Sequence, residues 1–273
     1  MKIIVINLAA ATDRLSFQQR QLGRLELAFD RLEGVSAHDI ESEVDQAIFG
    51  TWQRPMRPGE IACFLSHRAA WQRIVDSQEP TLVLEDDALL SSYVPNVLKA
   101  LSRWDCADHV TLEVRGRKKL VGRNAIPVTG PISALRIYQD RSGAAAYVLW
   151  PGGAEKLLSR TRQRAGLADA VIGDNYELCS YQLEPACAVQ LDQCSAYGLA
   201  KIIETKSTTV LDKTKRPDPG SIINAAGFRS RRIKAQVCML TRRLTVIHRA
   251  QRRIVKLDTS HFGWTGDAFV SQR

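Results

Sequence analysis

Short apolar runs alternate with longer, helically spaced stretches along the first two thirds of the chain. Residues 2–8 and 81–85 are short runs rich in aliphatic and β-branched residues, which is typical of buried strands. Apolar side chains recur every three or four positions from about Asp13 onward and again over 59–77, which predicts a helix in each stretch. Strands and helices that alternate in this order predict an α/β domain whose central sheet is mostly parallel.

Later segments extend the alternation. Further strands are expected at 29–37, 109–114, 135–139, 144–150 and 186–190, and a helix at 151–161. Residues 38–58 contain a Pro- and Gly-bearing stretch and are expected to form a loop or lid. The basic run 115–123 is expected to form a solvated hairpin or loop, and 168–183 a loop followed by a helix.

The composition changes near residue 205. Residues 205–228 are polar with Pro and Gly, which is typical of a linker. Over 229–257 apolar residues recur at steps of three, four or seven beside an Arg-rich side, which predicts a basic amphipathic helix. The predicted organisation is a domain over 1–204, a linker over 205–228 and a helical tail over 229–273.

The formal net charge of +9 belongs to the C-terminal part of the chain. Residues 216–273 contain 12 Lys or Arg and 3 Asp or Glu, so residues 1–215 are balanced. Such an asymmetry indicates a polyanionic surface near the tail, either membrane phosphate or nucleic acid. A helix packed on the domain is the other alternative. The charge pattern alone leaves these three alternatives open.

Other features limit the class of protein. The 6 cysteines are scattered without a CxxC pair, so neither a zinc site nor a disulfide framework is expected. No run reaches the roughly 18 apolar residues of a membrane span, and the apolar start of the chain ends at Asp13. We therefore expect a cytoplasmic protein that is not exported.

Three carboxylates follow the strand 81–85 without a break: Glu85, Asp86 and Asp87. Open α/β sheets bind ligands at the carboxyl ends of their strands. Carboxylate oxygens suit Mg²⁺ or Mn²⁺, and these ions typically bridge to substrate phosphates. A nucleotide diphosphate whose leaving-group charge needs neutralising would fit that chemistry, whereas helix capping is the plain alternative for such a triplet.

The segment PGEIACFLSHRAAWQRIV (58–75), followed by the acidic triplet, resembles glycosyltransferase family 25. The matching positions are Gly59, Glu60, Ile61, Cys63, Leu65, Ser66, His67, Trp71, Glu85, Asp86 and Asp87. VINLAAATDR, SGAAAYVLWPGGAEKLL and LADAVIGDN resemble three further family segments, although Ala168 stands where the family has Pro. The resemblance covers about residues 1–195.

The resemblance implies a GT-A-like single domain that binds a UDP-sugar and holds a divalent cation, Mn²⁺ or Mg²⁺, with the acidic motif. It also implies inversion at the anomeric carbon, which requires a carboxylate base for the acceptor hydroxyl. The expected reaction transfers a hexose, galactose in the first instance, to a lipopolysaccharide or lipooligosaccharide core sugar. The expected partners are therefore a UDP-sugar and a lipid-linked oligosaccharide. Because such an acceptor is made at the cytoplasmic face of a membrane, the basic tail is expected to bind the anionic membrane surface and no nucleic acid. The expected location is then peripheral, on the inner face of the cytoplasmic membrane.

The resemblance also assigns roles. Asp87 is the expected metal ligand, and Glu85 either shares the ion or holds the donor ribose. Asp169 and Asp174 are alternative bases, and each could instead cap a helix. The expected donor-binding residues are Asn7, Leu8, Arg14, Ser66, His67, Glu85, Asp86 and Gln190. Gln190 could instead line the acceptor side, and His67 could instead be an ordinary buried histidine without contact to the donor.

Two rival classes use the same residues differently. A metal phosphoesterase or nuclease would apply the acidic cluster to phosphodiesters, but it usually needs a second group of carboxylates or histidines for two ions. A non-catalytic, membrane-bound relative of the family would keep the motif without turnover.

Overall fold

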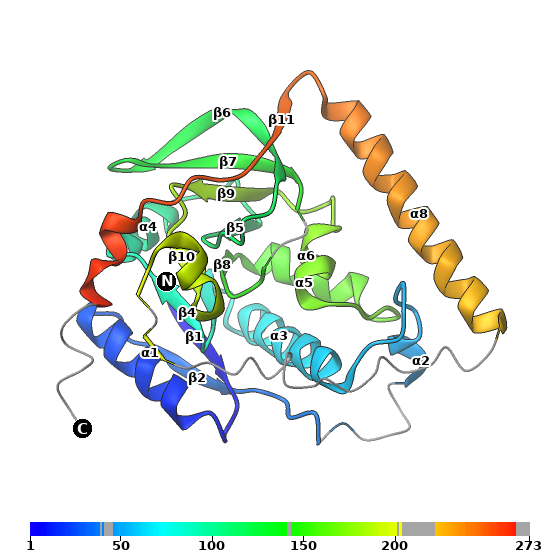
Figure 1. Cartoon of the computed structure of the whole chain (residues 1–273), viewed down its shortest axis with the longest axis horizontal. Helices are drawn as coiled ribbons and strands as arrows, with labels where there is room; N and C mark the ends of the chain where they lie inside the picture. Colours follow the sequence, from blue (N-terminus) through cyan, green and yellow to red (C-terminus); the bar gives the residue numbers. More distant parts are fainter. Residues whose placement is uncertain (39, 41–45, 141–142, 201, 204–221, 266–273) are drawn as a thin grey trace.

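The computed structural model describes residues 1–38, 40, 46–140, 143–200, 202–203 and 222–265, and they form a nine-stranded sheet with helices on both faces (Figure 1). The strand order is β11-β6-β7-β9-β5-β8-β3-β1-β2. The strands are β1 (Lys2–Asn7), β2 (Asp30–Glu33), β3 (Thr81–Glu85), β5 (His109–Thr111), β6 (Lys119–Thr129), β7 (Ile132–Gln139), β8 (Ala146–Leu149), β9 (Ser180–Glu184) and β11 (Ala250–Arg253).

The sheet is mixed, so the prediction of a mostly parallel sheet is wrong. Strand β1 is parallel to β2 and β3, and β5 is parallel to β9. Strand β8 lies antiparallel between β3 and β5, and the β6–β7 hairpin joins the sheet antiparallel through β9. Apolar periodicity identifies strands but does not report their direction, which depends on the partner each strand finds.

Two apolar layers cover the sheet. Along β1, Ile3 and Val5 point into one core and Ile4 and Ile6 into the other, because successive side chains of a strand alternate between faces. The first core contains α4 (Val94–Leu101) and part of α1 (Thr12–Arg24). The second contains α3 (Pro58–Ser77), α5 (Pro151–Arg160) and α6 (Ala168–Gly173). These layers hold the carboxyl ends of β1 and β3 in place.

A small second sheet follows the acidic triplet. Strand β4 (Ala88–Leu90) pairs antiparallel with β10 (Ala188–Gln190), and Ala88 lies opposite Gln190. The 3₁₀ helix η1 (Leu191–Tyr197) comes next. This pairing brings residue 190 beside residues 85–87.

Two further predictions need correction. The basic run 115–123 was predicted as a solvated hairpin or loop. Its second part does begin the β6–β7 hairpin, but it is not solvated there, because β6 starts at Lys119, whose buried ammonium contacts Asp140 at 2.6 Å. Residues 168–183 form α6 and then β9 rather than a loop and a helix. Part of the predicted loop 38–58 forms the short helix α2 (Gln46–Phe49), whereas 39 and 41–45 lie outside the described residues.

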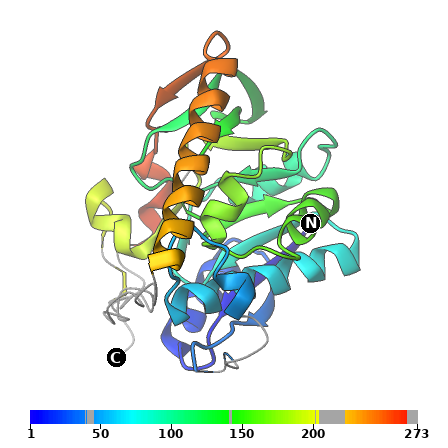
Figure 2. The same ribbon diagram turned by 90° about the vertical axis from the view of Figure 1, so that its right-hand side faces the viewer.

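The C-terminal region contains a helix that stops earlier than predicted. Helix α8 spans Ile222–Val246, and β11 then pairs antiparallel with β6, so a single helix through 257 is wrong. After β11, Val255 and Phe262 are buried beside Phe17, and η2 (Thr259–Thr265) ends the described chain (Figures 1 and 2). Most of the predicted linker, 205–221, lies outside the described residues. Among the described helices, none is long and apolar enough to cross a membrane.

Candidate active site

A cleft of about 900 Å³ opens where β1 and β3 end. Its walls come from the loop after β1, the first half of α3, the residues after β3, the start of α6 and the end of β10. Glu85 lines this cleft. Eight more of the residues predicted to bind the metal or the donor, or to act as base, also line it: Leu8, Arg14, Ser66, His67, Asp86, Asp87, Asp169 and Gln190. The position agrees with the rule that open sheets bind ligands beyond the carboxyl ends of their strands.

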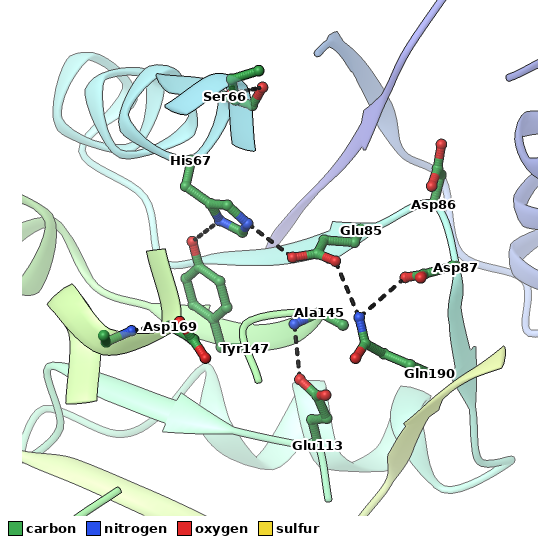
Figure 3. Close-up of polar contacts among 12 residues, drawn as sticks. Ser66, His67, Glu85, Asp86, Asp87, Glu113, Ala145, Tyr147, Asp169 and Gln190 are labelled. Carbon is green, nitrogen blue, oxygen red and sulfur yellow. Dashed lines mark hydrogen bonds and ion pairs between the residues drawn. The ribbon is translucent and has the colours of Figure 1, made fainter. Parts of the chain in front are cut away.

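Glu85 is held by two neighbours inside this cleft (Figure 3). His67 Nε2 lies 3.1 Å from Glu85 Oε1, and Gln190 Nε2 donates to Oε2 at 3.2 Å. Burial would raise the pKa of Glu85, but the hydrogen bond from His67 and the nearby positive charges, Arg115 and Arg14 among them, outweigh it and lower that pKa below the usual value. Glu85 therefore stays ionised and accepts hydrogen bonds.

His67 is oriented from behind by a buried pair. Tyr147 Oη lies 2.9 Å from His67 Nδ1 and accepts a hydrogen bond from Trp71 Nε1 at 2.9 Å. An ionised Glu85 only accepts, so His67 Nε2 carries the proton, and in the neutral ring Nδ1 accepts from the Tyr147 hydroxyl. The tautomer of His67 is thus set from both sides.

Asp86 contacts two residues from the first part of the chain, at the end of β1 and in α1. Arg14 Nη1 lies 3.2 Å from Asp86 Oδ1, and Asn7 Nδ2 donates to Oδ2 at 2.7 Å. Burial nevertheless raises the pKa of Asp86 to about 6, against the opposing effects of Arg14 and Asn7. Asn7 is 1 % exposed and does not line the cleft, so it supports Asp86 from below, whereas Arg14 faces the cleft.

Asp87 is the least compensated carboxylate of the three. Its Oδ1 lies 3.5 Å from Gln190 Nε2, the same amide that reaches Glu85. Burial, followed by the negative charges of Glu85 and Asp86, raises its pKa well above the usual value. A positive charge placed here would counteract that shift.

The donor set fits a hard divalent cation. Glu85 and Asp87 both approach the Gln190 Nε2 donor, so an ion that took the place of this donor would have carboxylate oxygens from both, as Mg²⁺ and Mn²⁺ prefer. A softer alternative is Cys63, His67 and Glu85, whose ligand atoms lie within 4.8 Å of one another. Hard cations such as Mg²⁺ and Mn²⁺ prefer oxygen to thiol sulfur, so the set with Cys63 suits them less well than Glu85 with Asp87.

The two candidate bases occupy different places. Asp169 lies in the first turn of α6 on the cleft wall, where its Oδ1 accepts the Ala170 amide at 2.8 Å and burial raises its pKa. Asp174 forms an ion pair with Arg160 at 3.1 Å and is not part of the cleft lining. The structure therefore brings Asp169, but not Asp174, to the acidic triplet's cleft.

Ser66 and Leu8 also line the cleft. Ser66 Oγ donates to the Ala62 carbonyl and accepts the Val35 amide, both at 2.8 Å. Since its hydroxyl is engaged on both sides, Ser66 fixes the loop after β2 against α3.

Sequence reasoning missed two residues at this site. Arg115 lines the cleft and donates to Gln190 Oε1 and, at 3.0 Å, to Asp192 Oδ2. Its position within a basic run suggested solvation, whereas the bridge between Glu113 and Ala188 places it beside β10 and Gln190.

Glu113 was not predicted because its neighbours in the sequence form no motif that indicates a functional site. It is 1 % exposed, its Oε2 accepts the Ala145 amide at 2.8 Å, and its Oε1 has no hydrogen-bond partner among the described residues. Burial, with the charge of Glu85, raises its pKa to about 8. A Cβ at Gly143 would lie 2.2 Å from Glu113 Oε2, and Gly143 has a φ of +71°, so only glycine fits there.

The sequence is similar to several known proteins. The family model described as glycosyltransferase family 25 (LPS biosynthesis protein) matches residues 1–172. The lipooligosaccharide biosynthesis protein lic2B of Haemophilus influenzae is 24 % identical over 240 residues, which cover 82 % of this chain and 90 % of that protein.

Animal relatives match a shorter part. Human procollagen galactosyltransferase 2 is 27 % identical over 171 residues, which cover 58 % of this chain but only 27 % of the human protein. A glycosyltransferase 25 family member of Aedes aegypti is 38 % identical over 88 residues, 29 % of this chain and 14 % of that protein. Because the family model matches well over half of the sequence, the chain belongs to glycosyltransferase family 25.

Proposed function

We propose that the protein is an inverting glycosyltransferase that moves a hexose from a UDP-sugar to a core sugar of lipopolysaccharide or lipooligosaccharide. The observation that carries this proposal is the arrangement of Glu85 and Asp87 around the Gln190 amide at the carboxyl end of β3, inside a cleft of about 900 Å³. Such a cleft is large enough for a nucleotide sugar. In this proposal residues 1–204 form a GT-A-like donor-binding domain.

The charges of the cleft support a diphosphate donor. Arg14 and Arg115 both line it, and guanidinium groups suit phosphate oxygens. Mn²⁺ or Mg²⁺ bound through Asp87 and Glu85 would neutralise the charge that develops on the leaving diphosphate. His67 keeps Glu85 ionised and oriented for that role.

Asp169 is the proposed base. It lines the same cleft from α6, and a raised pKa makes a carboxylate a better proton acceptor for the acceptor hydroxyl. A base and a leaving group on different walls of the cleft are what inversion by a single displacement requires.

The names of the relatives indicate which substrates to test first. The Haemophilus relative is named for lipooligosaccharide biosynthesis and the human one as a galactosyltransferase. Galactose is therefore the first donor sugar to test, and a lipid-linked oligosaccharide is the first acceptor. Such an acceptor would place the enzyme at the inner face of the cytoplasmic membrane.

The decisive experiment is hydrolysis of UDP-hexoses by the full chain without acceptor, with and without Mn²⁺. We expect UDP release that depends on the ion and falls roughly a hundredfold or more in Asp87→Ala, which removes a direct ligand. The exposed Asp76→Asn on α3 is the matched control and should keep full activity. Near wild-type turnover in Asp87→Ala would exclude this metal assignment.

The same preparation separates the rival classes. A phosphoesterase or nuclease would hydrolyse bis(p-nitrophenyl) phosphate in preference to UDP-hexose. A non-catalytic relative would bind UDP-hexose without cleaving it to release UDP. Either result would overturn the proposed function.

A further inference from the structure

Helix α8 packs on the domain by one side only. Arg231 Nε donates to the Trp52 carbonyl at 2.8 Å, and Arg242 Nε donates to the Tyr138 carbonyl at 3.4 Å. Val246, at the end of the helix, is fully buried. These three residues follow one another at steps of eleven and four, which places them on one side of the helix.

The opposite side of α8 is apolar and exposed. It carries Ile233, Val237, Leu240, Leu244 and, just past the helix end, Ile247, each between 53 and 60 % exposed. They follow one another at alternating steps of four and three, so they form one continuous stripe. Figure 2 looks directly at α8, and no other drawn ribbon covers it in this view. An amphipathic helix normally turns such a stripe toward the core.

The borders of the stripe are basic. Arg229, Arg232 and Arg243 lie along one border and Lys234 along the other, and all four are exposed. The sequence contains no Asp or Glu from residue 222 to residue 257. An apolar stripe between cationic borders is the pattern of a helix that lies in the plane of a lipid interface.

We propose that this outer face of α8 docks on an anionic lipid surface, with the stripe buried at the headgroup boundary and the basic borders against lipid phosphates. Charge decides between occupants. A second copy would place two arginine-rich borders against each other, and like charges at such an interface are costly. Residues 204–221 of this chain are mainly polar in sequence and offer little apolar surface to cover the stripe.

The docked helix is tied to the wall of the cleft. Arg231 also donates to the Gly50 carbonyl at 2.9 Å, and the ring of Trp52 packs directly over Gly166, one residue before the cleft-lining Leu167. Lipid contact through α8 would therefore fix the orientation of the cleft relative to the membrane surface. The docking itself depends only on α8 and does not rest on the proposed transfer reaction.

The test is sedimentation of the full chain with vesicles of phosphatidylcholine containing roughly one third phosphatidylglycerol. We expect the protein to pellet with these vesicles at low ionic strength, to pellet less at high ionic strength, and to stay in solution with pure phosphatidylcholine. Failure to pellet with the anionic vesicles at low ionic strength would overturn the proposal.

Substitutions identify the surface. Leu240→Ser with Leu244→Ser should lower the vesicle partition coefficient at least about tenfold, because two half-exposed leucines lose their buried area. Arg232→Gln with Arg243→Gln should lower it about fivefold per arginine at low salt only. Ile126→Ser removes an exposed apolar group far from α8 in the sequence and is the matched control.

Two outcomes would contradict this assignment. Unchanged partition of the double leucine variant would show that another surface binds lipid. A dimer in sedimentation velocity that the leucine variant dissociates, without vesicle binding by the parent chain, would assign the stripe to a second copy. Thermal unfolding and UDP-hexose hydrolysis are measured separately, so a loss of fold or of activity is not mistaken for a loss of docking.

Discussion

Glu85 takes its properties from side chains that are distant in the sequence. His67 and Gln190 hold its two oxygens from residues 18 and 105 positions away. Its neighbour Asp87, with the same chemistry, has a raised pKa because burial and two adjacent charges are not offset. Two carboxylates of one triplet therefore differ in the direction of their pKa shift, and their partners decide which way each shifts.

The choice of base is testable at this scale. Asp169→Asn should lower transfer to an acceptor by about 10²–10⁴, since the acceptor hydroxyl loses its proton acceptor. Asp174→Asn is the matched control and should stay near wild type, because Asp174 lies outside the cleft lining and pairs with Arg160. The measurement is the transfer rate at saturating donor. Equal losses in both variants would refute the assignment.

Glu113 predicts a pH effect on stability. Its pKa of about 8 in the folded chain exceeds the ordinary 4.5, so the folded state keeps this proton after the unfolded state has lost it. The contribution of Glu113 to the free energy of unfolding therefore decreases as the pH rises from about 4.5 to about 8. Glu113→Gln removes the effect and still accepts the Ala145 amide.

Relative to the parent, Glu113→Gln should thus be more stable above about pH 8 and little changed near pH 5. Urea denaturation at both values checks this. A stability difference that is the same at both would contradict the buried, protonated state.

At the scale of elements, helix α5 is fixed by a close approach to β5. A Cβ at Gly153 would lie 2.5 Å from the Asp108 carbonyl oxygen, whereas one at Gly152 would be 3.8 Å from the nearest other group, the Asp108 carboxylate. The sequence GGA thus contains one glycine required by packing and one that is not.

Alanine substitutions separate the two glycines. Gly153→Ala should destabilise the protein by about 1–3 kcal/mol, because backbone or helix must shift. Gly152→Ala is the matched control and should be neutral or stabilising by up to about 1 kcal/mol. Midpoints of urea denaturation measure both, and equal midpoints would show that the approach of α5 to β5 does not constrain residue 153.

At the scale of the whole molecule, the end of the described chain packs into an apolar cluster with residues from the first half of the chain. Phe262 is fully buried in a cluster with Phe17 and Leu89, and β11 extends the edge of the sheet through β6. The α8 helix is therefore held at both ends, by Arg231 near its start and by β11 after it.

Phe262→Ala should cost about 3–5 kcal/mol of the free energy of unfolding, as expected for a buried aromatic ring. Ile254→Ala, at a position 49 % exposed, should change it by less than about 0.5 kcal/mol. Chemical denaturation of both variants tests this, and a small effect of Phe262→Ala would mean that the C-terminal segment folds independently.

The sequence by itself determined the elements whose signal is local. The strands at 2–8 and 81–85 and the helix at 59–77 follow from apolar spacing, and they correspond to β1, β3 and α3. The acidic triplet at the end of β3, with the motif on α3, was sufficient to indicate the cleft. These features depend on neighbours within a few residues, which the sequence displays directly.

Only the tertiary structure decided what depends on distant partners. The direction of β8, the entry of β6 and β11 into the sheet, and the positions of Arg115, Glu113 and Gln190 all result from strand pairing across many residues. The outward direction of the α8 stripe is of the same kind, because the sequence shows an amphipathic helix but not the side on which it packs. Strand partners and packed faces are chosen by the whole core together, and no local pattern encodes that choice.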